Sequence, residues 1–177
     1  MSAHSRSLAS MVIDDFSKPA PLAANGASWR LFTDQVMGGV SRGTMARETV
    51  NGRPAVRMRG EVSLENNGGF VQIALDLIPD GGAFDASGFA GIELDVLGNG
   101  ETYGLHLRTE DVARPWQSYR QRFRAPERWQ TVRLPFAGFE AYRIDAPLDL
   151  RRLRRIGVVA IGRAFNADLS VGRAAFY

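Results

Sequence analysis

The 177-residue sequence contains no cysteine. This absence excludes disulfides, thiolate nucleophiles and cysteine-bound zinc or iron–sulfur clusters. Histidine is also scarce, since only His4 and His106 are present, and a site with two imidazoles would have to recruit the N-terminal segment. We therefore expect no cofactor. A calcium ion held by loop carbonyls together with Asp14, Asp15 or Asp34 is chemically feasible, but no spacing signature supports it.

Long hydrophobic runs are missing as well. No stretch of about 18 apolar residues occurs, and the first residues carry no apolar segment long enough for a secretory signal. We expect no transmembrane segment and a cytoplasmic protein. Residues 1–10 are expected to form a disordered tail, followed by a single domain over residues 11–177.

The apolar residues that are present alternate with polar ones, which is typical of strands with one buried face. A nearly continuous apolar run at 156–161 predicts a central strand covered on both faces, and a change of phase near Gly172 predicts a β-bulge. Ten or eleven short strands are expected, at residues 12–16, 29–33, 55–59, 61–65, 71–77, 92–96, 103–107, 119–124, 129–134, 156–161 and 169–177.

Helical signals are weak. Only residues 149–155 suggest a helix of one or two turns, with Asp149 as its N-cap. The glycine-rich segment 98–104 is expected to form a hairpin turn, because a dinucleotide-binding loop would need a helix after it. Without alternating strands and helices there is no parallel sheet to build, so the sequence predicts an all-β antiparallel sandwich, a jelly roll with one short helical turn.

Two glycine-rich segments carry the candidate binding residues. In the first, DQVMGGVS at residues 34–41, the glycines free the backbone beside polar and apolar side chains. In the second, ENNGGF at residues 65–70, the asparagines offer paired donors and acceptors. The simpler alternative is that both are tight turns whose side chains bond local backbone. The candidate residues are Asp34, Met37, Gly38, Gly39, Ser41, Glu65, Asn66, Asn67 and Gly69.

A row of arginines is a separate candidate. Alternation places Arg120, Arg122 and Arg124 on one face of a strand, with a repeat close to the phosphate spacing of an extended nucleic acid. The alternative is a solvated face that pairs with acidic neighbours such as Glu93 and Asp95. No nucleophile elbow, phosphate loop or carboxylate pair is recognisable, so we predict no catalytic residues and no enzyme activity.

Several motifs in order resemble one known family. Trp29 followed by FTDQVMGGVS, then ENNGGF, LGNGETY, YRQRF and WQTVRLPFAGF, is similar to the complex I intermediate-associated protein 30 family, over residues 12–177. The resemblance implies a galactose-binding-like β-sandwich. It also implies, for mitochondrial relatives, a non-catalytic factor that helps assemble the membrane arm of respiratory complex I. With its short N-terminal tail, the chain resembles a stand-alone bacterial member.

The family's shared loop residues would fall on both glycine-rich segments, from Asp34 to Ser41 and from Asn66 to Phe70. We therefore expect a non-catalytic binding module, of the assembly-factor or chaperone type, that docks a protein partner on these loops, respiratory complex subunits among the candidates. Nucleic acid is disfavoured as a partner.

The alternative is a carbohydrate-binding module. Trp116 or Trp129 would stack on a sugar while Asn66 and Asn67 bond its hydroxyls. Trp116 is the better platform, because Trp129 begins an alternating strand. A third hypothesis places an anionic partner along the row of arginines.

Overall fold

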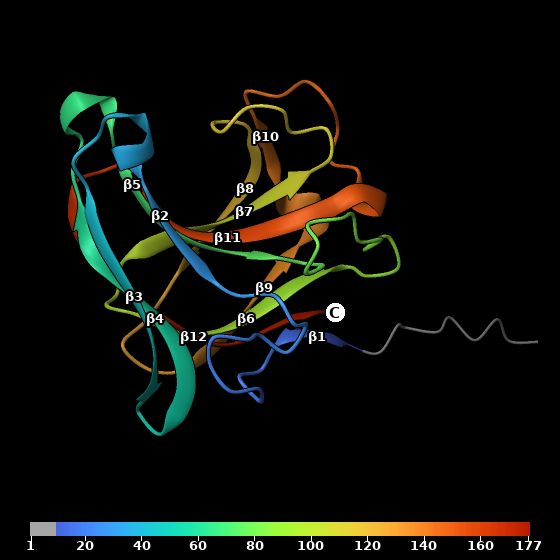
Figure 1. The fold of residues 1–177 in the computed structure, drawn as a ribbon, viewed down its shortest axis with the longest axis horizontal. Coiled ribbons are helices and arrows are strands. Elements are labelled where there is room, and N and C mark those ends of the chain that lie inside the picture. The colour runs from blue at the N-terminus through green and yellow to red at the C-terminus, as the bar shows by residue number, and fades with distance from the viewer. Residues whose placement is uncertain (1–9) are drawn as a thin grey trace, which may run out of the picture.

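The computed structural model describes residues 10–177, which form two antiparallel sheets packed face to face (Figure 1). The expected all-β sandwich is confirmed. The expected disordered tail falls almost wholly on residues 1–9, outside the described residues. No helix in residues 10–177 is long and apolar enough to cross a bilayer.

The first sheet has the strand order β3-β4-β12-β6-β9, and β1 pairs with β12. Its members are β1 (Met11–Asp14), β3 (Arg42–Val50), β4 (Arg53–Val62), β6 (Gly91–Leu97), β9 (Gln130–Pro135) and β12 (Phe165–Phe176). The predicted bulge is confirmed, since the register of β12 with β6 shifts between Val171 and Arg173.

The second sheet has the order β10-β8-β7-β11-β5-β2. Its members are β2 (Arg30–Thr33), β5 (Phe70–Asp76), β7 (Thr102–Thr109), β8 (Ser118–Arg124), β10 (Glu140–Tyr142) and β11 (Leu153–Ile161). The apolar run at 156–161 lies in β11, which pairs with β5 and β7, so its predicted central place is confirmed.

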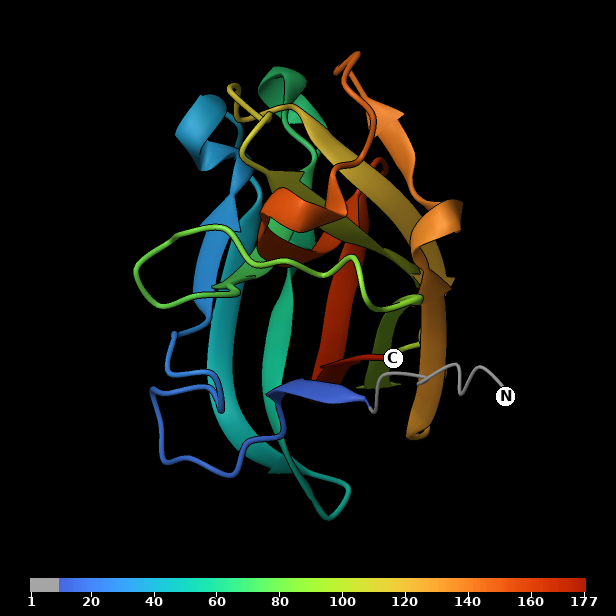
Figure 2. The same cartoon turned by 90° about the vertical axis from the view of Figure 1, so that its right-hand side faces the viewer.

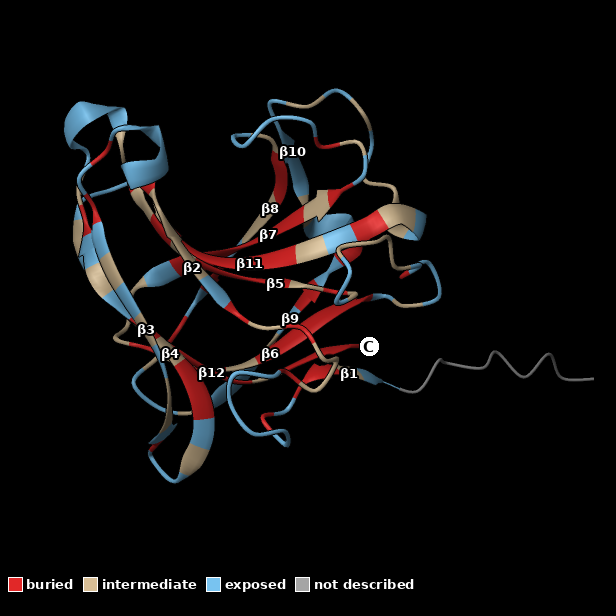
Figure 3. Cartoon of the chain, in the orientation of Figure 1, coloured by how far each residue is buried: buried red, intermediate tan, exposed pale blue. Residues whose placement is uncertain are grey.

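The core lies between the two sheets, where the inward residues of alternating strands meet. Met58 and Leu94 from the first sheet and Leu105 and Ile156 from the second are fully buried there. Figure 3 shows buried residues along the strands and exposed residues on the connections. Each sheet packs one face against the core, so the other face of the second sheet points away from it. The site described below lies on this outward face.

Two strands are missing from the sequence prediction. The edge strand β3 has few apolar residues and is mostly exposed or half-buried, so it carries no clear alternation. The three residues of β10 are all exposed. The two short strands predicted around Gly60 are one continuous strand, β4. A side chain at Gly60 would collide with the backbone of Arg42, so this glycine allows close approach of β3 rather than ending a strand.

The helical prediction also needs correction. Residues 149–155 contain only the 3-10 turn η4 (Leu150–Arg152). β11 begins at Leu153, which is paired with Thr109 of β7 and exchanges main-chain hydrogen bonds with Phe84. The predicted cap is confirmed, since the Asp149 side chain accepts from the Arg151 N–H. Three further 3-10 turns are η1 (Asp34–Met37), η2 (Glu65–Asn67) and η3 (Phe136–Gly138).

The expected hairpin at 98–104 is wrong. This segment leads from β6 in the first sheet to β7 in the second, so it crosses between the layers. The error arose because two strands separated by glycines have the same local pattern whether they pair or change sheet.

Candidate functional site

One buried carboxylate joins the two glycine-rich segments. The Asp34 side chain, at the start of η1, has no exposed surface. It accepts hydrogen bonds from the Ser41 N–H at 2.9 Å and from the Ser41 hydroxyl. It also accepts from the Gly69 N–H at 2.5 Å and the Phe70 N–H at 3.2 Å. Asp34 thus ties the β2–β3 connection to the β4–β5 connection, and η1 and η2 rise side by side (Figures 1 and 2).

The glycines of both segments make room for this carboxylate. A side chain at Gly39 or at Gly68 would collide with the Asp34 carboxyl group. Gly38 has a different role, because it ends η1 with a φ of 86°, in open space. The glycine-rich character of the motif therefore reflects close packing around Asp34 as well as the turn.

Asp34 is held as an anion. Burial by itself would raise the pKa of its carboxyl group, but the hydrogen bonds from Ser41, Gly69 and Phe70 outweigh burial and lower the pKa below its ordinary value of 3.8. The Ser41 hydroxyl extends the network, since it accepts from the Ser63 N–H at 2.9 Å. Asp34 therefore bonds protein groups, as the tight-turn alternative has it, but these groups include the distant Gly69 and Phe70 as well as the local Ser41.

A groove of about 780 Å³ lies beside these loops, over the outward face of the second sheet. Its floor comes from β5, β7, β8 and β11, including Gln72, His106 and Val159, whose strand neighbours face the core. One wall is formed by the η1 and η2 connections. The opposite wall is formed by residues 113–117 and 142–143, at the end of the molecule that also carries η1 and η2 (Figure 2).

The predicted site residues divide between the interior and the groove. Asp34, Gly39 and Ser41 are buried and lie outside the groove lining. Met37, Asn67 and Gly69 line its wall. The other three, Gly38, Glu65 and Asn66, are exposed beside the groove without lining it.

Exposed hydrophobic side chains gather at the groove. Among residues 10–177, eight large hydrophobic side chains are exposed, and five of them line the groove. Their exposed fractions run from 37% for Tyr142 to 70% for Val36, and the five are Val36, Met37, Leu64, Trp116 and Tyr142. Trp129 is outside the groove; its indole N–H donates to the Val50 carbonyl and Arg53 stacks on its ring.

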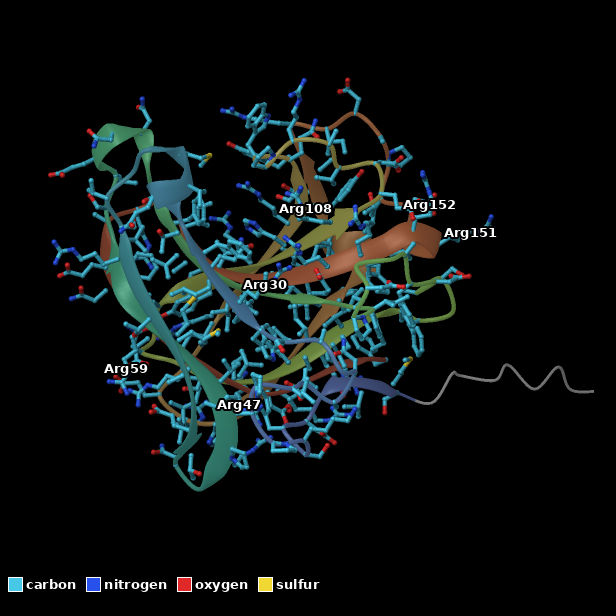
Figure 4. All side chains as sticks on the ribbon, viewed as in Figure 1. Arg30, Arg47, Arg59, Arg108, Arg151 and Arg152 are labelled. Atoms are coloured by element: carbon cyan, nitrogen blue, oxygen red, sulfur yellow. The ribbon has the colours of Figure 1, made fainter. Side chains whose placement is uncertain are left out.

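The charged groups of the groove are all basic. Arg108, Arg120, Arg143 and Arg155 line it, and no aspartate or glutamate is among the lining residues. Arg155 is paired with Asp76 at 2.8 Å. Figure 4 places Arg108 over the second sheet, between the two walls, whereas Arg47 and Arg59 lie far from it on the first sheet.

Arg108 and Arg120 have neutral partners. Arg108 donates at 3.3–3.5 Å to the carbonyls of three residues of the far wall, Arg114, Pro115 and Gln117. Arg120 donates to the Ser118 hydroxyl at 2.8 Å, and its guanidinium carbon is 3.6 Å from the centre of the Tyr142 ring. Burial lowers the pKa of both side chains below the ordinary 12.5, and neighbouring cations add to the effect.

His106 is neutral in this setting. Burial in the floor, followed by the charge of Arg120, lowers the pKa of its imidazole to about 3. Among residues 10–177, no three His, Asp or Glu side chains are grouped in a way that would hold a metal ion.

The three arginines of the predicted row do not lie in one site. Only Arg120 lines the groove, while Arg122 and Arg124 are exposed further along β8. The proposed pairing with Glu93 and Asp95 is wrong, because β6 belongs to the other sheet, where Glu93 pairs with Arg133 and Arg173.

Sequence reasoning missed most of the groove residues, notably His106, Arg108 and Tyr142. Alternation does put His106 and Arg108 on the face opposite Leu105 and Leu107. One wall, however, comes from residues 36–37 and 64–69 and the other from residues 113–117 and 142–143, and only the sheet order brings these distant segments opposite each other.

Solved structures share this architecture. A family 11 carbohydrate-binding module from Clostridium thermocellum, in complex with a β-1,3-1,4-mixed-linked tetrasaccharide, superposes with a TM-score of 0.72 over 94% of each chain, at 13% identity. A family 30 carbohydrate-binding module of a cellulosomal cellulase from Clostridium thermocellum gives a TM-score of 0.58, covering 76% of this chain and 82% of the other at 17% identity. At these identities the likeness establishes the fold alone.

Sequence comparison gives the family. No curated protein matches the chain. Residues 15–171 match the complex I intermediate-associated protein 30 family, and this match covers both glycine-rich segments and every strand except β1 and the last residues of β12. The chain therefore belongs to the complex I intermediate-associated protein 30 family.

Proposed function

We propose that the protein is a non-catalytic binding module of the assembly-factor type, which holds a segment of a partner polypeptide in the groove. The observation that carries the proposal is the concentration of exposed hydrophobic side chains there. Val36, Met37 and Leu64 stand on one wall, with Trp116 and Tyr142 on the other. Clustered exposed apolar surface of this kind is typical of interaction sites.

The shape of the groove supports the same conclusion. Its volume of about 780 Å³ is in the range of ligand-binding clefts. Met37 adds an unbranched side chain that can adapt to different apolar partners. The Asp34 network contributes indirectly, because it fixes the wall that carries Met37 and Asn67. In this proposal both glycine-rich segments contribute to binding because they hold the wall residues in place. They are the same two segments that carry the candidate binding residues in the sequence.

The chemistry of the groove favours binding over catalysis. General acid–base work needs a group that changes protonation near the working pH. His106 is held neutral by its surroundings, and the groove lining contains no carboxylate to act beside it.

Family membership suggests the partner, a protein on the assembly route of respiratory complex I. The test is made in cells that encode the protein, after deletion of its gene. Assembled complex I is quantified on native gels after complementation with wild type, with Met37→Asp or with Trp116→Ser. We expect wild type to restore assembly and both groove variants to restore less than a fifth of it.

Val40→Asp is the matched control, because Val40 is exposed in the same loop but lies outside the groove lining. It should restore assembly fully. Equal rescue by all four proteins would contradict the assignment of the groove, and normal complex I after gene deletion would contradict the assembly role.

A second candidate is carbohydrate binding. Trp116 and Tyr142 are exposed aromatic residues of the groove, although Arg120 covers one face of the Tyr142 ring. The amides of Asn67, Gln72 and Gln117 lie along the groove. Titration with a β-1,3-1,4-mixed-linked tetrasaccharide, monitored by tryptophan fluorescence, tests this function. Saturable binding that is lost in Trp116→Ala would support it. A flat titration, together with a glycan array without hits, would remove it.

A further inference from the structure

We infer that the groove recognises an acidic peptide segment, and that Arg108 and Arg120 bind its carboxylates. The inference rests on the proposed function, which places a partner polypeptide in the groove, and it adds the chemical class of that partner. It is carried by the one-sided charge of the groove and by the neutral partners of these two arginines.

Among residues 10–177, Arg155 alone of the four groove arginines has a carboxylate partner, so the charges of Arg108, Arg120 and Arg143 are uncompensated. The four arginines line the groove without a carboxylate among the lining residues. Three acids near the groove lie outside its lining. Glu65, in η2, is exposed and forms no ion pair among the described residues. Asp76 already pairs with Arg155 and Arg30, at 2.8 and 3.2 Å. Glu140 lies opposite Arg120 in the β10–β8 register, yet it is exposed, is not part of the lining and forms no ion pair with Arg120.

Arg108 and Arg120 are partly buried and keep free donors. A guanidinium has five N–H groups, and Arg120 uses its Nε–H on Ser118 while its plane stacks on Tyr142. This contact leaves the terminal nitrogens of Arg120 available in a fixed plane, which is the geometry that favours a bidentate carboxylate. Arg108 makes only long bonds to carbonyls. A partly desolvated cation without a counterion gains more from an incoming anion than an exposed arginine does.

The remaining lining favours a peptide over an acidic sugar. Sugar hydroxyls donate as well as accept hydrogen bonds, and the groove lining has no carboxylate to accept from them. The wall opposite Trp116 is aliphatic, with Val36, Met37 and Leu64 exposed. A segment that alternates acidic and apolar side chains would place its carboxylates on the basic floor and its apolar groups on the walls.

The experiment selects ligands without assuming their sequence. A library of random 12-residue peptides is panned on the wild-type protein, and the enriched peptides are synthesised with a fluorophore for anisotropy titration. We expect enrichment of Asp and Glu. Arg120→Gln should weaken binding at least tenfold, Arg108→Gln similarly, and Arg120→Lys by less. Replacing the peptide's acids by their amides should weaken binding to wild type but not to Arg120→Gln.

Arg122→Gln is the matched control. Arg122 is on the same strand and face as Arg120, but it lies outside the groove lining. It should bind the peptides as wild type does. Because Arg108 also holds the 114–117 loop, Arg120→Gln, which leaves those bonds intact, is the decisive variant, and its thermal unfolding midpoint is measured alongside.

The outcomes separate the inference from the proposed function. Neutral peptides whose binding is lost in Met37→Asp but unchanged in Arg120→Gln would overturn the inference and leave the groove as a peptide site. If no enriched peptide depends on either variant, both fail. If oligogalacturonates or single-stranded RNA bind in an Arg120-dependent way while no acidic peptide does, the peptide assignment is overturned.

Discussion

At the scale of single residues, Asp34 is the group on which the local structure of both glycine-rich segments depends. Replacing it with alanine leaves the Ser41, Gly69 and Phe70 N–H groups without their acceptor in a buried setting. We expect Asp34→Ala to lower the free energy of unfolding by about 2–4 kcal/mol in urea titrations. Glu65→Gln, on the exposed acid of η2, should stay within about 0.5 kcal/mol of wild type. Equal stabilities would show that the carboxylate does not hold the loops.

The two adjacent glycines make a matched pair. A Cβ at Gly39 would collide with the Asp34 carboxyl group, whereas a Cβ at Gly38 would meet open space but Gly38 has a left-handed φ of 86°. Gly38→Ala should cost about 1 kcal/mol, because only backbone strain opposes it. Gly39→Ala should cost about 2 kcal/mol or more, because Asp34 is fixed by its own bonds. Thermal melts of the two variants decide the order, and a larger loss for Gly38→Ala would refute the packing argument.

His106 gives a prediction for pH. The pKa of its imidazole is about 3 in the folded protein against 6.5 ordinarily, so the unfolded chain binds one more proton between those values. The free energy of unfolding therefore falls by about 1.4 kcal/mol for each pH unit that the pH drops within this window. His106→Gln removes this contribution. Urea titrations from pH 7 to pH 4 should show a shallower loss for the variant, and parallel curves would contradict burial of a neutral imidazole.

At the scale of elements, ion pairs tie the outer face of the first sheet together. Arg57 on β4 bonds Asp168 on β12 at 2.7 Å and Glu48 on β3 at 2.9 Å, so one side chain spans three strands. Arg59→Gln removes a more exposed contact to the same Glu48. We expect Arg57→Gln to lower the free energy of unfolding by about 1 kcal/mol and Arg59→Gln by under about 0.5 kcal/mol, both measured in urea. The reverse order would rule out the cross-strand role of Arg57.

Strands with a buried face were predictable, and strands without one were not. Alternation located β5, β6, β7 and β8 to within a few residues, because their inward positions are apolar, and a nearly continuous apolar run located β11. The edge strands β3 and β10 have little buried surface, so their pairing depends on neighbours that local sequence does not reveal. In the site, the two segments were predictable from their glycines. Which of their side chains turn inward was not, because the direction of Asp34 depends on N–H groups 35 residues away.

At the scale of the whole molecule, the protection of main-chain amides from hydrogen exchange should decrease from the centre of the second sheet to its edges. β11 is bonded on both edges and its residues 156–160 are buried. Hydrogen–deuterium exchange should be slowest there and faster in β3 and in the 110–117 loop. Uniform exchange across these segments would mean that the sandwich opens only as one unit.

The sandwich itself followed from composition and alternation, but the groove did not. It exists because the order β10-β8-β7-β11-β5-β2 places two connections on opposite sides of one outward face. Antiparallel strands with similar patterns are compatible with many orders. The family resemblance implied a galactose-binding-like β-sandwich, but no strand order was predicted from it.

The hydrogen-bond network of Asp34 affects the thermodynamics of partner binding. Since one rim is already immobilised by internal bonds, an incoming partner does not have to freeze it, and the unfavourable conformational entropy of association falls mainly on the partner. Such a binding site is preorganised. Its selectivity then comes from excluding peptide segments whose shape does not fit the groove, because the groove does not rearrange to fit each segment.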